Sequence, residues 1–163
     1  MVMTTETQTT KTSAPVIPPV RLAVDELAPR ITKAMNTLEA ASRHATSLEP
    51  VLIELVRARA SQLNGCAYCV DMHTRDALKA GDTQQRLFAL PVWRETPFFT
   101  ARERAALELT EAGTRLTDGP VPDEVFARAA AEFSETELAE LIWTIAVINA
   151  WNRLGAIARP WPL

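Results

Sequence analysis

The stretch Asn64-Gly65-Cys66-Ala67-Tyr68-Cys69-Val70-Asp71-Met72-His73 carries both cysteines of the 163-residue chain and one of its two histidines. The cysteines are three residues apart, and the histidine follows four residues after the second. On a helix, where each residue turns by about 100°, Cys69 lies about 60° round from Cys66, and His73 falls between them. One helix face would then carry two sulfurs and an imidazole, which is the outline of a dithiol redox centre.

Both cysteines would lie in the first turn of their helix, where free N–H groups and the helix dipole stabilise a thiolate. Two thiols at this spacing can close a disulfide after one of them is oxidised to a sulfenic acid. Two alternatives stay open. One is a pair of buried, inert cysteines, and the other is a structural zinc site with the ligands Cys66, Cys69, His73 and His44, the last from another helix.

Two further side chains could move protons beside the thiols. His73 can take or give a proton near neutral pH, and we favour that role over a core histidine bonded to the backbone. Glu54 precedes Leu55 on the apolar stripe of the preceding helix, where a carboxylate could orient His73 or hold a relay water. Taken alone, however, its position favours an ordinary solvated glutamate.

Composition indicates a soluble globular protein. Apolar residues make up 47% of the chain and charged residues 23%. The net charge of -3 argues against a nucleic-acid partner, and no apolar run approaches the length of a membrane span. The first 19 residues lack the apolar segment of a secretory signal. With only two cysteines, the expected setting is a reducing cytoplasm.

The periodicity predicts an all-α fold of six or seven helices and no strand. Residues 1–19 are rich in threonine and proline and are expected to be a flexible tail, with a single helical domain over 20–163. Capping boxes at Thr100–Glu103 and Ser134–Glu137 open two of the helices. The others are expected to begin near Pro29, Pro50, Cys66, Asp82 and Pro122, and the last to end at Ala158.

The chain resembles the alkylhydroperoxidase AhpD-like proteins, a branch of the carboxymuconolactone decarboxylase superfamily. In that family a glutamate stands twelve residues before a CxxC pair, and a histidine follows four residues after the second cysteine. The residues that carry the match are Glu54, Ser61, Asn64, Cys66, Tyr68, Cys69 and His73. The segment 148–154 is also similar to the last long helix of the short, single-domain members.

The resemblance implies a helical subunit that forms homotrimers or homohexamers and reduces peroxides. Cys69 would be the peroxidatic thiolate, Cys66 the resolving thiol, and Glu54 with His73 the proton relay. Well-known members have a histidine between the cysteines, where this chain has Ala67 and Tyr68.

We therefore expect a peroxide substrate and a dithiol reductant, either a lipoylated or a thioredoxin-like protein, without a cofactor, a metal, nucleic acid or a membrane. A redox-sensing or structural CxxC protein with little turnover, and a carboxymuconolactone decarboxylase-like lyase, are the alternatives.

Overall fold

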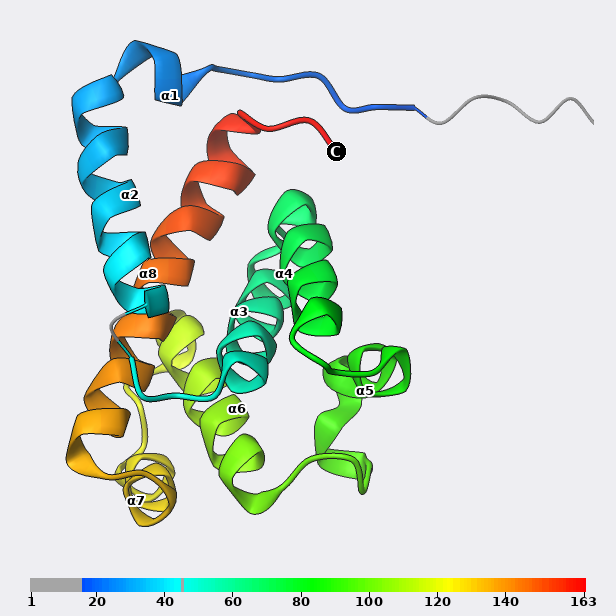
Figure 1. The fold of residues 1–163 in the computed structure, drawn as a ribbon, viewed down its shortest axis with the longest axis vertical. Coiled ribbons are helices and arrows are strands. Elements are labelled where there is room, and N and C mark those ends of the chain that lie inside the picture. Colours follow the sequence, from blue (N-terminus) through cyan, green and yellow to red (C-terminus); the bar gives the residue numbers. More distant parts are fainter. Residues whose placement is uncertain (1–15, 45) are drawn as a thin grey trace, which may run out of the picture.

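The computed structural model describes residues 16–44 and 46–163. These residues form eight α-helices and two 3-10 helices, with no strand among them (Figure 1). In chain order the elements are α1 (Val24–Leu27), α2 (Pro29–His44), α3 (Pro50–Asn64), α4 (Ala67–Lys79), α5 (Gln84–Ala89), η1 (Leu90–Glu95), α6 (Ala101–Thr114), η2 (Leu116–Asp118), α7 (Asp123–Glu132) and α8 (Glu135–Ala158).

The all-α prediction is confirmed, but six or seven was too low a number of α-helices. The addition is α1, whose four residues are too few to show a helical period. Tertiary hydrogen bonds hold it instead, from Thr32 and Trp161 to the carboxylate of Asp25. Most of the predicted tail, residues 1–15, lies outside the described part of the chain, and residues 16–22 are exposed and without regular secondary structure.

The two predicted capping boxes are both present. The hydroxyl of Thr100 accepts a hydrogen bond from the backbone of Glu103, and the Glu103 carboxylate accepts one from the backbone of Thr100. Ser134 and Glu137 make the same reciprocal pair at the start of α8. These pairs satisfy N–H groups that have no partner inside their own helix, so each fixes where its helix begins.

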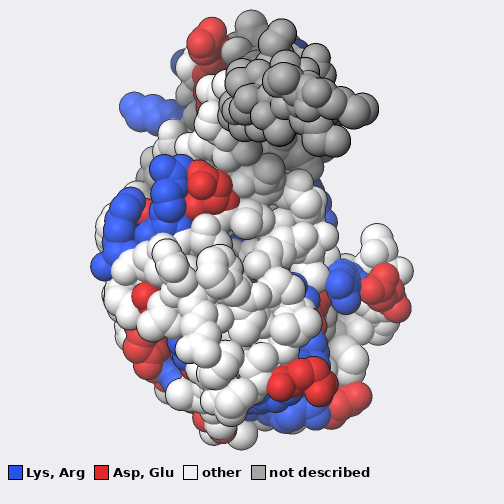
Figure 2. Space-filling model, turned by 90° about the vertical axis from the view of Figure 1, so that its right-hand side faces the viewer, with Lys and Arg blue, Asp and Glu red and all other residues white. Residues whose placement is uncertain are grey.

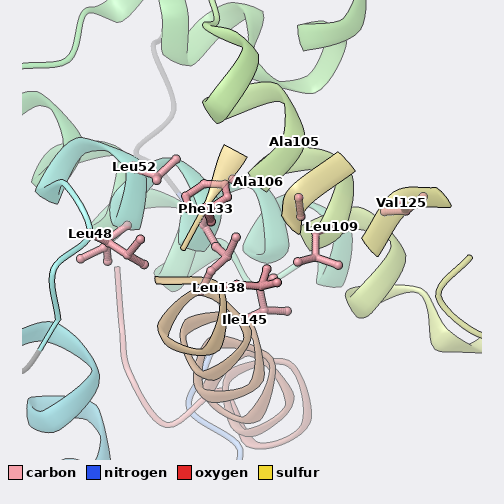
Figure 3. Packing of buried hydrophobic residues seen from close by; sticks show 13 residues of the cluster. Leu48, Leu52, Ala105, Ala106, Leu109, Val125, Phe133, Leu138 and Ile145 are labelled. Atoms are coloured by element: carbon pink, nitrogen blue, oxygen red, sulfur yellow. The ribbon is translucent and has the colours of Figure 1, made fainter. Parts of the chain in front are cut away.

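Helix α3 is the centre of the fold, and α4, α6 and α8 pack around it. Its ten consecutive residues from Leu52 to Ser61 are all buried, so it has no solvent-facing stripe. One apolar cluster joins α3 to α6, α7 and α8, as Figure 3 shows for Leu52, Leu109 and Ile145. A second cluster joins α3 to α4, α5, η1 and α6 around Leu55, Leu90 and Leu107.

Helix α8 is long and apolar enough, by length and composition alone, to cross a membrane. The expectation that no apolar run approaches that length is therefore wrong. Half of its most apolar window is buried inside the fold. Leu141 and Ile145, for example, belong to the cluster shared with α3 and α6, the position that a core helix occupies in a soluble protein.

The ends of the described chain meet at one end of the molecule. The backbone N–H groups of Arg21 and Leu22 both donate to the carbonyl of Ala158, at 3.1 Å each. Helix α2, at the left in Figure 1, lies along α8 and has no buried residue. The N-terminal helices and the C-terminal tail therefore form an outer layer over α8 and α4.

Candidate active site

The dithiol lies at the junction between α3 and α4. Gly65 ends α3 in the left-handed conformation (φ 68°, ψ 29°), which glycine adopts without steric strain. Cys66 is then the N-cap of α4, and its backbone N–H donates to the Ser61 carbonyl at 3.1 Å. Cys69 lies in the first turn, as predicted. The two sulfurs are joined in a disulfide, and each cysteine is only 2% exposed.

A glycine of α8 makes room for this disulfide. A Cβ atom at Gly155 would stand 2.6 Å from the sulfur of Cys66 and 3.6 Å from that of Cys69. No larger residue fits there while the disulfide keeps its place. The α3–α4 turn therefore packs directly on the backbone of α8.

An amide cluster fixes the same turn from the other direction. The side-chain NH₂ of Asn64 donates to the Oδ1 atoms of Asn149 and Asn152 on α8, at 3.0 Å each. Asn152 in turn donates to the hydroxyl of Ser61 at 2.9 Å, and Ser61 donates to the carbonyl of Arg57. Asn149 and Asn152 therefore hold the end of α3 that leads into Cys66, through Asn64 and Ser61.

Glu54 and His73 form a buried pair. Oε2 of Glu54 lies 2.7 Å from Nδ1 of His73, and the residues are 5% and 1% exposed. The interpretation of Glu54 as a solvated glutamate is thus wrong, because α3 is buried on every side. At this distance a carboxylate accepts from an imidazole N–H, an arrangement that leaves Nε2 to exchange a proton elsewhere.

Sequence reasoning missed the cation that completes this pair. Nη1 of Arg43, from α2, donates to Oε1 of Glu54 at 2.8 Å. Arg43 also binds Glu39 one helical turn earlier, which is the only local signal for it: a glutamate and an arginine four residues apart. The carboxylate of Glu54 therefore has a donor on each oxygen.

The charges continue beyond Arg43. Glu39 also pairs with the fully buried Arg57 and accepts a hydrogen bond from the indole of Trp151. Burial alone would raise the pKa of Glu39, but the Arg57 charge and the hydrogen bonds from Arg43 and Arg57 outweigh it and lower the pKa. Glu39 thus stays ionised, and so keeps Arg43 in place beside Glu54.

A cavity of about 550 Å³ opens over this group. Cys69, His73, Arg43 and Glu39 line it together with the aromatic rings of Tyr68, Trp151 and Trp161. The Trp161 ring lies 5.1 Å from that of Tyr68 and 5.8 Å from that of Trp151, between centroids. Its indole donates to Asp25 at 2.8 Å, so the C-terminal tail is fastened over the cavity.

The four ligands of the alternative zinc site do not lie together in the structure. Within residues 16–44 and 46–163, no group of three or more His, Cys, Asp and Glu side chains is placed to share a metal ion. His44 lies exposed at the end of α2, and both cysteine sulfurs are already bonded to each other. The structure instead brings Cys69 and His73 to one cavity, with Glu54 bonded to the imidazole and Cys66 bonded to Cys69.

Fold and site define an all-helical protein with a dithiol beside a buried carboxylate–imidazole pair. A model of the carboxymuconolactone decarboxylase family matches residues 29–112. YdfG of Bacillus subtilis, an uncharacterised protein, is 40% identical over 135 residues, which cover 83% of this chain and 91% of YdfG. YnjA of Escherichia coli, also uncharacterised, is 36% identical over 114 residues, or 70% of this chain and 62% of YnjA.

A solved structure has the same fold. It is a protein of unknown function from Agrobacterium tumefaciens with a suggested role as the antioxidant defence protein AhpD. It matches with a TM-score of 0.84 and 35% identity, over 88% of this chain and 97% of the other. The chain therefore belongs to the carboxymuconolactone decarboxylase family, as an AhpD-like member.

Replacing Gly155 with alanine tests the packing of the disulfide on α8. The new Cβ would overlap the sulfur of Cys66, so we expect Gly155→Ala to lower the free energy of unfolding of the oxidised protein by about 1–3 kcal/mol. Urea unfolding without reductant measures the change. Gly113→Ala is the matched control, because its Cβ would lie 3.4 Å from a methyl of Ile145 and alanine favours a helix. Equal stability of the two variants would contradict this packing.

Proposed function

We propose that the protein is a thiol-dependent peroxidase that reduces hydrogen peroxide and alkyl hydroperoxides. The observation that carries the proposal is the hydrogen bond between Glu54 and His73, a histidine that lines the same cavity as Cys69. Reduction of a peroxide requires a nucleophile and a group that delivers a proton. The oxidisable thiol can supply the first, and the buried acid–imidazole pair can supply the second.

The proposed reaction has two steps. The Cys69 thiolate attacks one peroxide oxygen, the O–O bond breaks, and the departing oxygen takes a proton to leave as an alcohol or water. Cys69 is then a sulfenic acid. The Cys66 thiol attacks that sulfur, water leaves, and the disulfide seen in the structure results. A dithiol then reduces the disulfide and is itself oxidised.

The position of Cys69 in α4 and the buried Glu54–His73 pair have different roles in this reaction. Cys69 lies in the first turn of α4, where unpaired N–H groups favour its thiolate. His73 follows one turn later on the same helix. With its Nδ1 proton held by Glu54, its Nε2 takes the thiol proton of Cys69 and passes it to the departing oxygen. Arg43 keeps Glu54 in place, so we regard Arg43 as a positioning residue.

The partners in this proposal are a peroxide and a dithiol protein, either lipoylated or thioredoxin-like, in a reducing cytoplasm. The family also includes decarboxylases, but a lactone lyase has no evident use for two adjacent thiols. Loss of activity in a Cys66→Ser, Cys69→Ser double variant separates the two chemistries. Repeated turnover with dithiol donors distinguishes a catalyst from a redox sensor, which would be oxidised once and recycled slowly.

Peroxide should consume both thiols, but through Cys69 first. We expect the reduced protein to take up about one equivalent of peroxide per subunit and to form the Cys66–Cys69 disulfide, measured by thiol titration and mass spectrometry. Cys66→Ser should stop at a sulfenic acid on Cys69 that dimedone traps. Cys69→Ser should not react at a comparable rate. An unchanged thiol titre after peroxide would refute the proposal.

Removing the charge of Glu54 should slow the reaction without unfolding the protein. Glu54→Gln can no longer hold the Nδ1 proton of an imidazolium strongly, so we expect the rate of oxidation by peroxide to fall about a hundredfold. Stopped-flow fluorescence of the tryptophans near the cavity is one way to follow it. Glu111→Gln is the control, a buried glutamate that pairs with Arg59 and Arg94 instead. Equal losses in the two variants would mean a purely structural role.

We further propose that the subunits form a homotrimer or homohexamer. Supporting this, α2 has no buried residue in the single chain, and Trp143 of α8, which lines a surface pocket with Leu38 and Ala41 of α2, is exposed. A second exposed set lies at α5 and η1, with Phe88 79% exposed. The face on the α4 and α5 side is largely uncharged at its centre (Figure 2).

A charge on the α2–α8 surface should disrupt this assembly. We expect light scattering to give the mass of three or six subunits for the unaltered chain and a smaller species for Trp143→Glu, because a buried unpaired carboxylate is unfavourable. Leu116→Glu, at an exposed leucine of η2, is the control. A monomeric unaltered chain would contradict the assembly.

A further inference from the structure

A second cavity reaches the disulfide from the side of Cys66. It has a volume of about 300 Å³ and is lined by Cys66, Gly155 and Ala156, by the turn Gly65–Tyr68, and by residues of the two chain ends, including Arg21 and Arg159. Cys69 and His73 do not line it; they line the larger cavity. The two cysteines of one disulfide therefore line different cavities.

Two aromatic rings separate these cavities. Tyr68 and Trp161 line both of them, and their ring centroids are 5.1 Å apart. Trp161 is also fastened to Asp25 and packs on Trp151, so the wall is held from both sides. Gly155 supports the same division, because its missing Cβ would lie 1 Å nearer to the sulfur of Cys66 (2.6 Å) than to that of Cys69 (3.6 Å).

We propose that the reductant enters through this second cavity and attacks Cys66, while peroxide reaches Cys69 through the first. The inference builds on the proposed peroxidase cycle and assigns a separate route to each half of it. Because Cys66 is 2% exposed and the cavity is small, the reductant is a slender dithiol, such as one on an extended arm, rather than a cysteine set in a globular surface.

The sulfur that is attacked decides what is released. A donor thiolate bonds to the sulfur of Cys66 as the Cys66–Cys69 bond breaks, and the electron pair leaves on Cys69. The second donor thiol then attacks the first donor sulfur, which frees Cys66 and oxidises the donor to a disulfide. The two donor protons end on the two cysteines. Attack at Cys66 thus makes Cys69 the leaving group and frees its sulfur beside His73, at the peroxide cavity.

Trapping the mixed disulfide tests the choice of sulfur on the unaltered chain. The disulfide is formed with diamide, exposed briefly to 2-mercaptoethanol, and quenched with acid and N-ethylmaleimide. Fragment mass spectra of the peptide that spans both cysteines should place mercaptoethanol on Cys66 and maleimide on Cys69. The reverse placement would overturn the proposal. Since diamide forms the disulfide, the result stands whether or not the protein reduces peroxide.

Blocking each cavity tests the separation of the routes. Ala156 is exposed and lines only the second cavity, whereas Asn36 is exposed and lines the first. We expect Ala156→Trp to slow reduction by dithiothreitol about tenfold and to change oxidation by peroxide less than about twofold, because thiol exchange depends on access. Asn36→Trp should do the opposite. If Ala156→Trp slows both reactions, or neither, the two routes are not separate.

Discussion

The contact between the α3–α4 turn and the backbone of α8 is the constraint on which the site depends. The absence of a side chain at Gly155 lets the sulfur of Cys66 lie against this helix, and Asn64 ties the turn to Asn149 and Asn152. With the turn held, the first residues of α4 have a fixed direction. Cys69 and His73, one helical turn apart, then meet the same cavity.

A buried charge network is the second constraint, and it stabilises the site more than the fold. Glu54, His73, Arg43, Glu39 and Arg57 are drawn from α2, α3 and α4, and each ion taken out of water carries a desolvation penalty that its partners offset only in part. Apolar side chains of similar volume would pack the same helices together without that desolvation penalty. The arrangement makes sense if the ionised Glu54 is needed beside the imidazole.

Local signals in the sequence were enough for most of the helices. Proline at the first turn of α2 and α3, and the two capping boxes, are patterns within four residues. The CxxC spacing likewise places its sulfurs from local geometry. Glu54 was different, because its burial depends on α3 being surrounded by three helices, and no periodicity in its own segment shows that. Position on the stripe suggested that Glu54 could orient His73 but favoured a solvated glutamate, and only the family resemblance favoured the pairing.

Residues from the ends of the chain were beyond any local signal. Trp161 follows the last helix between two prolines and resembles a loop residue in sequence. It nevertheless packs between Tyr68 and Trp151, and its indole donates to Asp25, just before α2. The contact joins positions 136 residues apart. The same contact holds the aromatic rings beside the disulfide against residues near both ends of the described chain. Access to the sulfurs therefore depends on this outer layer, which the helical core does not need in order to pack. Substitutions in the layer can thus alter the reactivity of the cysteines while the core stays unchanged.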